Sequence, residues 1–112
     1  MPKFIAISYG DQAGYDRTPP DVRDAARAED AKLQKNGAVM GMAGEPVQVR
    51  NPDALKVSVT KGPFLQSPMP VAGFHMIEAA DLNAAIDMIS KGPGAVMHGV
   101  VEVWPLKTSK SD

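Results

Sequence analysis

Apolar residues occupy both alternating sides of residues 4–8, the sequence Phe-Ile-Ala-Ile-Ser near the start of the chain. Successive side chains of a strand point to opposite faces of the sheet, so this pattern is typical of a central strand that is covered on both sides. A chain of 112 residues fits one domain, and domains of this size leave much apolar surface only partly covered. The sequence therefore predicts a sheet with two apolar faces, and a second copy of the chain could cover one of them.

Two helices are predicted from their end signals. The first spans residues 19–36: Thr18 is an N-cap residue type, Pro19 suits the first helical position, and Gly37 is a usual C-terminal cap. The second helix begins after the N-cap residue Asp81 and ends at the Gly-rich residues 91–94. Alternating or short apolar runs predict strands over residues 4–8, 39–43 with 47–50 as its continuation, 55–60, 73–79 and 96–104.

The order of these elements is strand, helix, three strands, helix, strand. It predicts an α+β domain with a ferredoxin-like antiparallel sheet, two helices on one face and an extra hairpin strand. The turn residues Asn51, Pro52 and Asp53 favour a hairpin at that point of the chain. We expect one domain over residues 1–106, because no linker or repeat divides them, followed by a polar C-terminal tail over residues 107–112.

Three short motifs carry a resemblance to a known family. They are Lys61-Gly62-Pro63-Phe64, Gly73-Phe74-His75 and Asp81-Leu82-Asn83-Ala84-Ala85. Their order resembles the YCII-related (DGPF-domain) family, in which an Asp-Gly-Pro-Phe turn stands where this chain has Lys61. The resemblance implies a homodimeric α/β barrel around a small pocket. Part of that family has a candidate His and Asp pair on its first helix, but the matching positions here hold Ala26 and Lys35.

Composition excludes several classes of function. Lys and Arg number 12 against 13 Asp and Glu, with no block of like charge, so we expect no nucleic-acid partner. The sequence has no cysteine, which excludes disulfides, thiolate catalysis and a cysteine-based zinc site. The apolar run at the N-terminus is too short for a signal peptide or a membrane span. We therefore expect a cytoplasmic protein without a membrane partner.

The two histidines of the chain, His75 and His98, are the candidate catalytic residues. Both fall in predicted strands, and both could face one cavity from either side of Ile5, Ile7 and Tyr9. Imidazole changes its charge near neutral pH, which suits proton transfer. The alternative is that both are partly buried histidines that backbone groups or water satisfy.

Four further residues are candidate ligand-binding residues. Tyr9 could orient a ligand, Asp11 lies in a charged loop after the first strand, Glu29 lies on the apolar stripe of the first helix, and Phe74 precedes His75. The alternatives are solvated charge for Asp11 and a slightly rotated helix that places Glu29 at the rim. Two histidines and one carboxylate match the composition of a facial-triad metal site. Their spacing is not diagnostic, and we expect no metal or cofactor.

These expectations lead to two hypotheses of function. The first is a homodimeric protein of the YCII-like type that binds a small organic molecule in the barrel interior and catalyses proton-transfer or lyase chemistry. The second is a non-catalytic module, either a ligand sensor or an accessory to another protein. The residues alone leave open whether the protein is an enzyme.

Overall fold

The computed structural model describes residues 1–107 and has an α+β fold, as predicted. The expected C-terminal tail therefore lies outside the described residues, apart from Lys107. The elements in chain order are β1 (Lys3–Tyr9), α1 (Gln12–Arg17), α2 (Pro20–Lys35), β2 (Val39–Met42), β3 (Val47–Arg50), a 3₁₀ turn (Pro52–Ala54), β4 (Ser58–Lys61), β5 (Val71–Glu78), α3 (Leu82–Ser90), α4 (Pro93–Val96) and β6 (Val100–Pro105).

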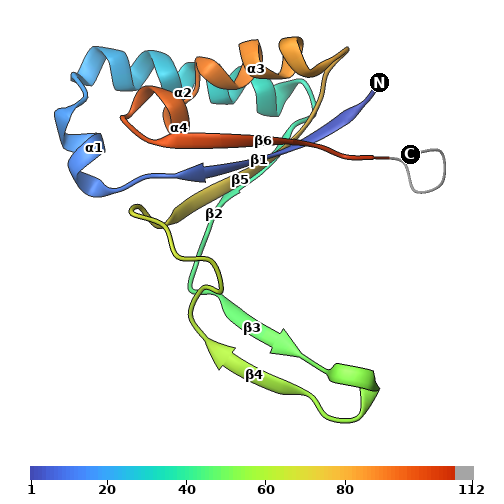
Figure 1. Cartoon of the computed structure of the whole chain (residues 1–112). Coiled ribbons are helices and arrows are strands. Elements are labelled where there is room, and N and C mark those ends of the chain that lie inside the picture. Colours follow the sequence, from blue (N-terminus) through green and yellow to red (C-terminus); the bar gives the residue numbers. More distant parts are fainter. Residues whose placement is uncertain (108–112) are drawn as a thin grey trace.

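Four strands form one sheet in the order β2-β5-β1-β6, and every neighbouring pair is antiparallel. The helices lie on one side of this sheet, and β1 runs through its middle (Figure 1). Strands β3 and β4 form a separate two-stranded hairpin that projects from the other side. The predicted hairpin is thus confirmed, but its first strand does not extend β2 within the main sheet.

The helix-covered face of the sheet holds the core. Phe4, Ala6 and Ser8 of β1 point to this face and are buried. Their partners on β5 are Ile77, His75 and Gly73, which share the same face because paired residues lie on one side of a sheet. The buried apolar cluster consists of Phe4, Ala6, Ile77 and Ala79 from the sheet side and Ala85 and Ile89 from α3.

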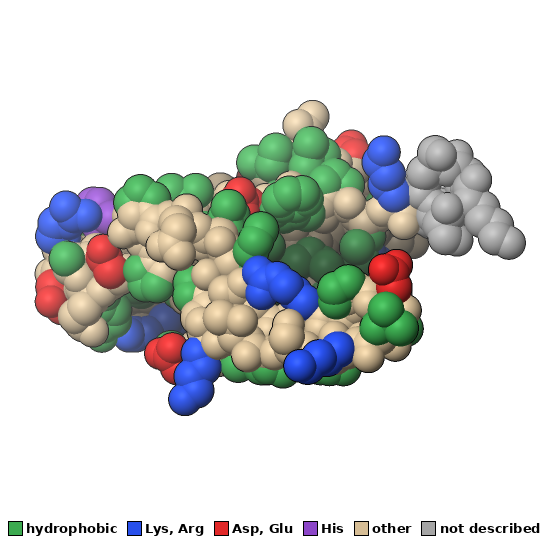
Figure 2. Space-filling model, turned by 60° about the horizontal axis from the view of Figure 1, so that its bottom comes forward, with side chains coloured by type: hydrophobic (Ala, Val, Ile, Leu, Met, Phe, Trp, Pro, Cys, Tyr) green, Lys and Arg blue, Asp and Glu red, His purple; other side chains and the backbone are tan. Residues whose placement is uncertain are grey.

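The opposite face of the sheet, which we call the open face, is apolar and uncovered. Ile5 and Ile7 of β1 pair there with Met76 and Phe74 of β5, and Trp104 of β6 lies beside Ile5. Phe74 is 46% exposed and Trp104 is 54% exposed. Figure 2 views the molecule with this side brought forward and shows hydrophobic side chains gathered around a hollow. The predicted second apolar face is therefore present.

The strand expected over residues 96–104 is wrong in its first half. The chain instead forms α4 over Pro93–Val96, and β6 begins only at Val100. Pro93 occupies the first helical position, where its missing N–H costs nothing, and this favours a helical turn. His98 then adopts a left-handed conformation with φ of 64° between α4 and β6, so it lies in no strand.

Two other segments also differ from expectation. Residues 12–17, expected as a loop, form α1, because the Asp11 side chain accepts a hydrogen bond from the Gly14 N–H at 2.9 Å and caps the helix. Thr18 does not cap α2; its hydroxyl donates to the Gly14 carbonyl at 2.8 Å. In the hairpin, β4 starts at Ser58 rather than at residue 55, because Pro52–Ala54 form a 3₁₀ turn.

Small residues let α4 approach the sheet closely. A Cβ atom on Gly94 would lie 2.7 Å from Ser8 Oγ and 2.8 Å from Val101 Cγ2, both closer than ordinary contact. A side chain at position 94 would therefore push α4 away from β1 and β6. Because Gly94 also lines the cavity described below, this contact sets the position of one cavity wall.

Candidate functional site

A cavity of about 590 Å³ lies on the helix-covered side of the sheet. Its walls come from the end of β1, from α1 and α2, from β2 and β5, and from the segment around α4. Its volume is in the range of small-molecule sites, roughly 300–1,000 Å³. The lining residues that carry polar or titratable groups are Ser8, Tyr9, Asp11, Gln12, Tyr15, Arg27, Asp30 and His75.

His75 and Asp30 meet at the wall of this cavity. The Nε2 atom of His75 on β5 lies 3.2 Å from the Oδ1 atom of Asp30 on α2. The His75 side chain is 13% exposed and that of Asp30 is 25% exposed. An imidazole and a carboxylate in contact, partly screened from water and beside a cavity, are a pair that can hold and transfer a proton.

The second ring nitrogen of His75 is enclosed. Nδ1 is buried and has no hydrogen-bond partner among the described residues. A buried N–H without an acceptor costs about 1–3 kcal/mol, so Nδ1 is better placed as the unprotonated nitrogen. Nε2 then carries the proton and donates it to Asp30. Among the described residues, Nε2 is thus the nitrogen of His75 that contacts another polar group.

Tyr15 and Arg27 form the outer wall of the cavity, and Arg23 lies over the Tyr15 ring. Arg27 Nη2 donates a hydrogen bond to the Tyr15 hydroxyl at 3.0 Å, and Arg23 lies over the Tyr15 ring with its Cζ 4.2 Å from the ring centroid. The hydrogen bond from Arg27, followed by the positive charges of Arg23 and Arg27, lowers the pKa of Tyr15 below its ordinary value. This part of the cavity is therefore positively polarised.

Tyr9 and Asp11, two predicted ligand-binding residues, line the cavity, but their polar groups have partners. The Tyr9 hydroxyl donates to Glu102 Oε1 at 2.8 Å. Glu102 pairs with Ile7 and so belongs to the open face. The hydrogen bond to Glu102, with desolvation and the negative charge adding to it, raises the pKa of Tyr9. Asp11 Oδ1 caps α1. The Tyr9 hydroxyl therefore lies towards the open face, and the Asp11 oxygen that caps α1 already has a partner.

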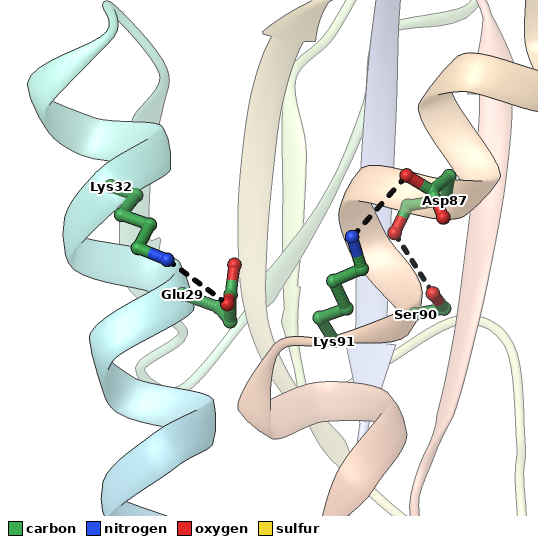
Figure 3. Close-up of polar contacts among 5 residues, drawn as sticks. All are labelled: Glu29, Lys32, Asp87, Ser90 and Lys91. Carbon is green, nitrogen blue, oxygen red and sulfur yellow. Dashed lines mark hydrogen bonds and ion pairs between the residues drawn. The ribbon is translucent and has the colours of Figure 1, made fainter.

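The other predicted residues lie apart from the cavity. Glu29 pairs with Lys32 on its own helix, with Oε1 3.3 Å from Nζ, as Figure 3 shows beside the local contacts of Asp87 on α3. Phe74 belongs to the open face and is half exposed. His98 lies in the turn between α4 and β6 and is not among the residues that line the cavity. His75 pairs with Ala6, on the opposite face from Ile5 and Ile7, so the two histidines do not flank Ile5 and Ile7 from neighbouring strands as expected.

The structure does not bring together the ligands of the facial-triad alternative. Within residues 1–107, no three His, Asp, Glu or Cys side chains are grouped closely enough to hold a metal ion. A second cavity, of about 600 Å³, lies between the C-terminal part of α2, α3 and the edge of the sheet. Its lining is mostly apolar, including Leu33, Ile77 and Met88, and it lacks a paired acid and base. The cavity at His75 is therefore the better candidate for chemistry.

Asp30 is the functional candidate that the sequence pattern missed. The expected apolar stripe of the first helix contains Val22, Ala25, Ala26 and Leu33, with Glu29 near its middle. In the structure Ala26 is buried, whereas Val22 and Ala25 are exposed. A stripe that repeats at i, i+4 and i+7 from Ala26 reaches Asp30 and Leu33. The buried face of α2 is thus centred about one residue further along the chain than the expected stripe, and it includes Asp30.

Comparisons with known proteins add no family assignment. No protein-family model matches the chain, and the search of curated proteins gave no match. Among the described residues, no helix has the length and apolar character that crossing a membrane requires.

Proposed function

We propose that the cavity at His75 and Asp30 binds a small organic molecule and moves a proton to or from it. The observation that carries this proposal is the 3.2 Å contact between His75 Nε2 and Asp30 Oδ1 at the wall of a cavity of about 590 Å³. Contacts of this kind pre-align a base and hold it for a ligand. The cavity is on the helix-covered side, which moves the proposed chemistry away from the barrel interior.

In this mechanism Asp30 is the base and His75 its positioning partner. His75 donates from Nε2 to Asp30 Oδ1, which fixes the carboxylate and leaves Oδ2 for a ligand proton. Asp30 is the more exposed of the two, and Nδ1 of His75 is closed off. When Asp30 accepts a ligand proton at Oδ2, the Nε2–H of His75 keeps its hydrogen bond to Oδ1 and holds the carboxyl group in place.

We further propose that the chain is YCII-like, has a ferredoxin-like topology and forms a homodimer. The strand order β2-β5-β1-β6 with α2 and α3 on one side supports the topology. The turn at Lys61-Gly62-Pro63-Phe64 follows β4, and Gly62 has φ of 97°, a conformation that glycine adopts without strain. The open face supports a dimer, because large side chains such as Phe74 and Trp104 are left to water.

A second candidate function is ligand binding without turnover. One specific observation favours it: His75 and Asp30 satisfy each other and tie α2 to β5, which is also what a structural ion pair does. In that case the protein senses or carries its ligand. The two functions differ in whether Asp30 exchanges protons with the bound molecule.

Proton exchange separates the two functions without knowledge of the natural substrate. Small ketones, lactones and 2-oxo acids are incubated with the protein in D₂O, and the loss of their acidic C–H signals is followed by ¹H NMR. We expect protein-dependent exchange with at least one probe, and a decrease of about 100-fold or more in Asp30→Asn. His75→Gln should slow exchange less, and His98→Ala should leave it unchanged because His98 lies outside the cavity.

Two outcomes would contradict the catalytic proposal. Exchange that Asp30→Asn leaves intact removes Asp30 as the base. Binding without exchange, seen as shifted methyl signals of the cavity-lining Met40 and Met97, supports the non-catalytic alternative.

A further inference from the structure

The outer wall of the cavity has N–H donors that no hydrogen bond within residues 1–107 occupies. Arg27 has five N–H donors, and within the described residues it makes one hydrogen bond, to the Tyr15 hydroxyl. Asp24 Oδ1 lies 3.7 Å from Arg27 Nη1, too far for a hydrogen bond. The Arg27 side chain is about half exposed at this position, so its remaining donors can reach the cavity and its mouth.

The Tyr15 hydroxyl is a second hydrogen-bond donor at this wall of the cavity. Its hydroxyl oxygen accepts from Arg27, which leaves its own hydrogen to be donated, and no acceptor for it is present among residues 1–107. Arg23, stacked over the ring at 4.2 Å, adds a second positive charge. The lowered pKa of Tyr15 is consistent with a phenol that donates strongly. The Arg27 guanidinium and the Tyr15 hydroxyl therefore lie together at one wall of the cavity, and each keeps at least one N–H or O–H that can donate to a ligand.

Two carboxylates line the same cavity. Asp30 lines the cavity from α2 beside His75, and Asp11 lines it from the N-terminus of α1. A bound anion is attracted to Arg27 and repelled by Asp30, so an asymmetric molecule enters in one orientation. A dianionic phosphate needs more hydrogen-bond donors than one lining arginine and one phenol provide. The two carboxylates that line the cavity would also repel it. A singly charged, planar carboxylate fits this balance better.

We propose that Arg27 and Tyr15 bind the carboxylate of a small organic acid, whose uncharged end then lies at Asp30 and His75. This inference rests on the proposed function of the cavity and names the class of molecule that it takes. The Arg27 guanidinium donates to the carboxylate, and the Tyr15 hydroxyl donates a further hydrogen bond to it.

The test uses three probes of similar shape: benzoate, its neutral counterpart benzamide, and phenyl phosphate. Binding is followed by NMR titration of ¹³C-methyl methionine protein, using Met40 and Met97 at the cavity and Met88 at the second cavity as reference. We expect benzoate to bind about tenfold more tightly than benzamide, as a charge-assisted hydrogen bond predicts. Phenyl phosphate should bind no more tightly than benzoate.

Variants assign the effect to the proposed groups. Arg27→Gln should remove the preference for benzoate, Arg27→Lys should retain part of it, and Tyr15→Phe should weaken benzoate about threefold to tenfold. Benzamide binding should change little in all three. Arg50→Gln removes a guanidinium from the exposed hairpin strand β3, and it is the matched control that should behave as wild type.

Three results would overturn the carboxylate assignment: equal binding of benzoate and benzamide, a preference that survives Arg27→Gln, or tighter binding of phenyl phosphate through Arg27. These results leave the proton-exchange experiment on Asp30 unaffected. Loss of exchange in Asp30→Asn together with no acid preference would therefore reject the ligand class and retain the proposed function.

Discussion

The two faces of the four-stranded sheet are built from the same strands but from different kinds of residue. Towards the helices β1 presents Ala6 and Ser8, and β5 presents Gly73 and His75 opposite them. Towards the open side the larger Ile5, Ile7, Met76 and Phe74 occupy the intervening positions. Small residues on the covered face let α4 and its neighbours come close, and they leave the cavity beside His75. In our proposal, the covered face holds the chemistry and the open face the association of two copies.

The largest expected effect is a difference in the free energy of unfolding between substitutions on the two faces. Ile77 is 2% exposed on the covered face, whereas the adjacent Met76 is 43% exposed on the open face. Ile77→Ala should lower the free energy of unfolding by about 2–5 kcal/mol, because it leaves a core cavity. Met76→Ala should cost less than ~1 kcal/mol in the monomer.

Urea denaturation at low protein concentration measures both values. Raising the concentration should increase the cost of Met76→Ala alone if a second copy covers the open face. Similar costs at low concentration would contradict the division between a core face and an uncovered face.

The next effect concerns association. Phe74→Glu places a charge in the middle of the open face, and we expect it to weaken the proposed homodimer by about 2 kcal/mol or more, as for a central aromatic residue of an interface. Leu82→Glu on α3 is the matched control, since Leu82 is 44% exposed and Phe74 is 46% exposed. Sedimentation should show wild type and Leu82→Glu as dimers and Phe74→Glu as a monomer. A monomeric wild type at micromolar concentration would contradict the dimer.

The smallest effect is on the ionisation of two phenols, one on each side of the sheet. The pKa of Tyr15 is lowered by Arg27 and Arg23, and the pKa of Tyr9 is raised by Glu102. An ultraviolet titration should therefore show two steps, which Tyr9→Phe and Tyr15→Phe assign, because the chain has 2 tyrosines. Arg27→Gln should raise the lower pKa, and Glu102→Gln should lower the upper one. A single unresolved step would contradict the opposed environments.

The two pKa shifts make the free energy of unfolding depend on pH in opposite directions. Because the pKa of Tyr9 is raised in the fold, its contribution is present below the ordinary tyrosine pKa and is lost as the pH rises through the raised value. The lowered pKa of Tyr15 gives a contribution that is present above the ordinary value and is lost as the pH falls through the lowered one. Tyr9→Phe should therefore reduce the loss of stability at alkaline pH, which thermal denaturation between neutral and alkaline pH measures.

The fold was predictable where the signals are local. Asp81 caps α3 as expected, accepting from the Ala84 N–H at 2.8 Å, and the apolar alternation of β1 gave the two faces. The segment before β6 was harder, because the residues Val96, Met97 and Val100 look strand-like. Pro93 and Gly94 instead start a helical turn there, and the absence of a side chain at Gly94 lets this turn lie against Ser8 and Val101.

The site was predictable in part. His75 was identified, and it does line a cavity, but its face depends on the β1–β5 register, in which it pairs with Ala6. Asp30 was missed, because a helix whose apolar residues are mostly alanines marks its buried face weakly. The role of Arg27 with Tyr15 depends on how α1 packs against α2, which no local pattern encodes.

The most direct test of the division between the faces is a ligand-mapping experiment on ¹³C-methyl methionine protein. Met40 and Met97 line the cavity beside His75, and Met76 lies on the open face. On addition of benzoate or benzamide, we expect the methyl signals of Met40 and Met97 to shift and that of Met76 to stay in place. A shift at Met76, with Met40 and Met97 and the Met88 signal of the second cavity all unchanged, would place small-molecule binding on the open face and contradict the account.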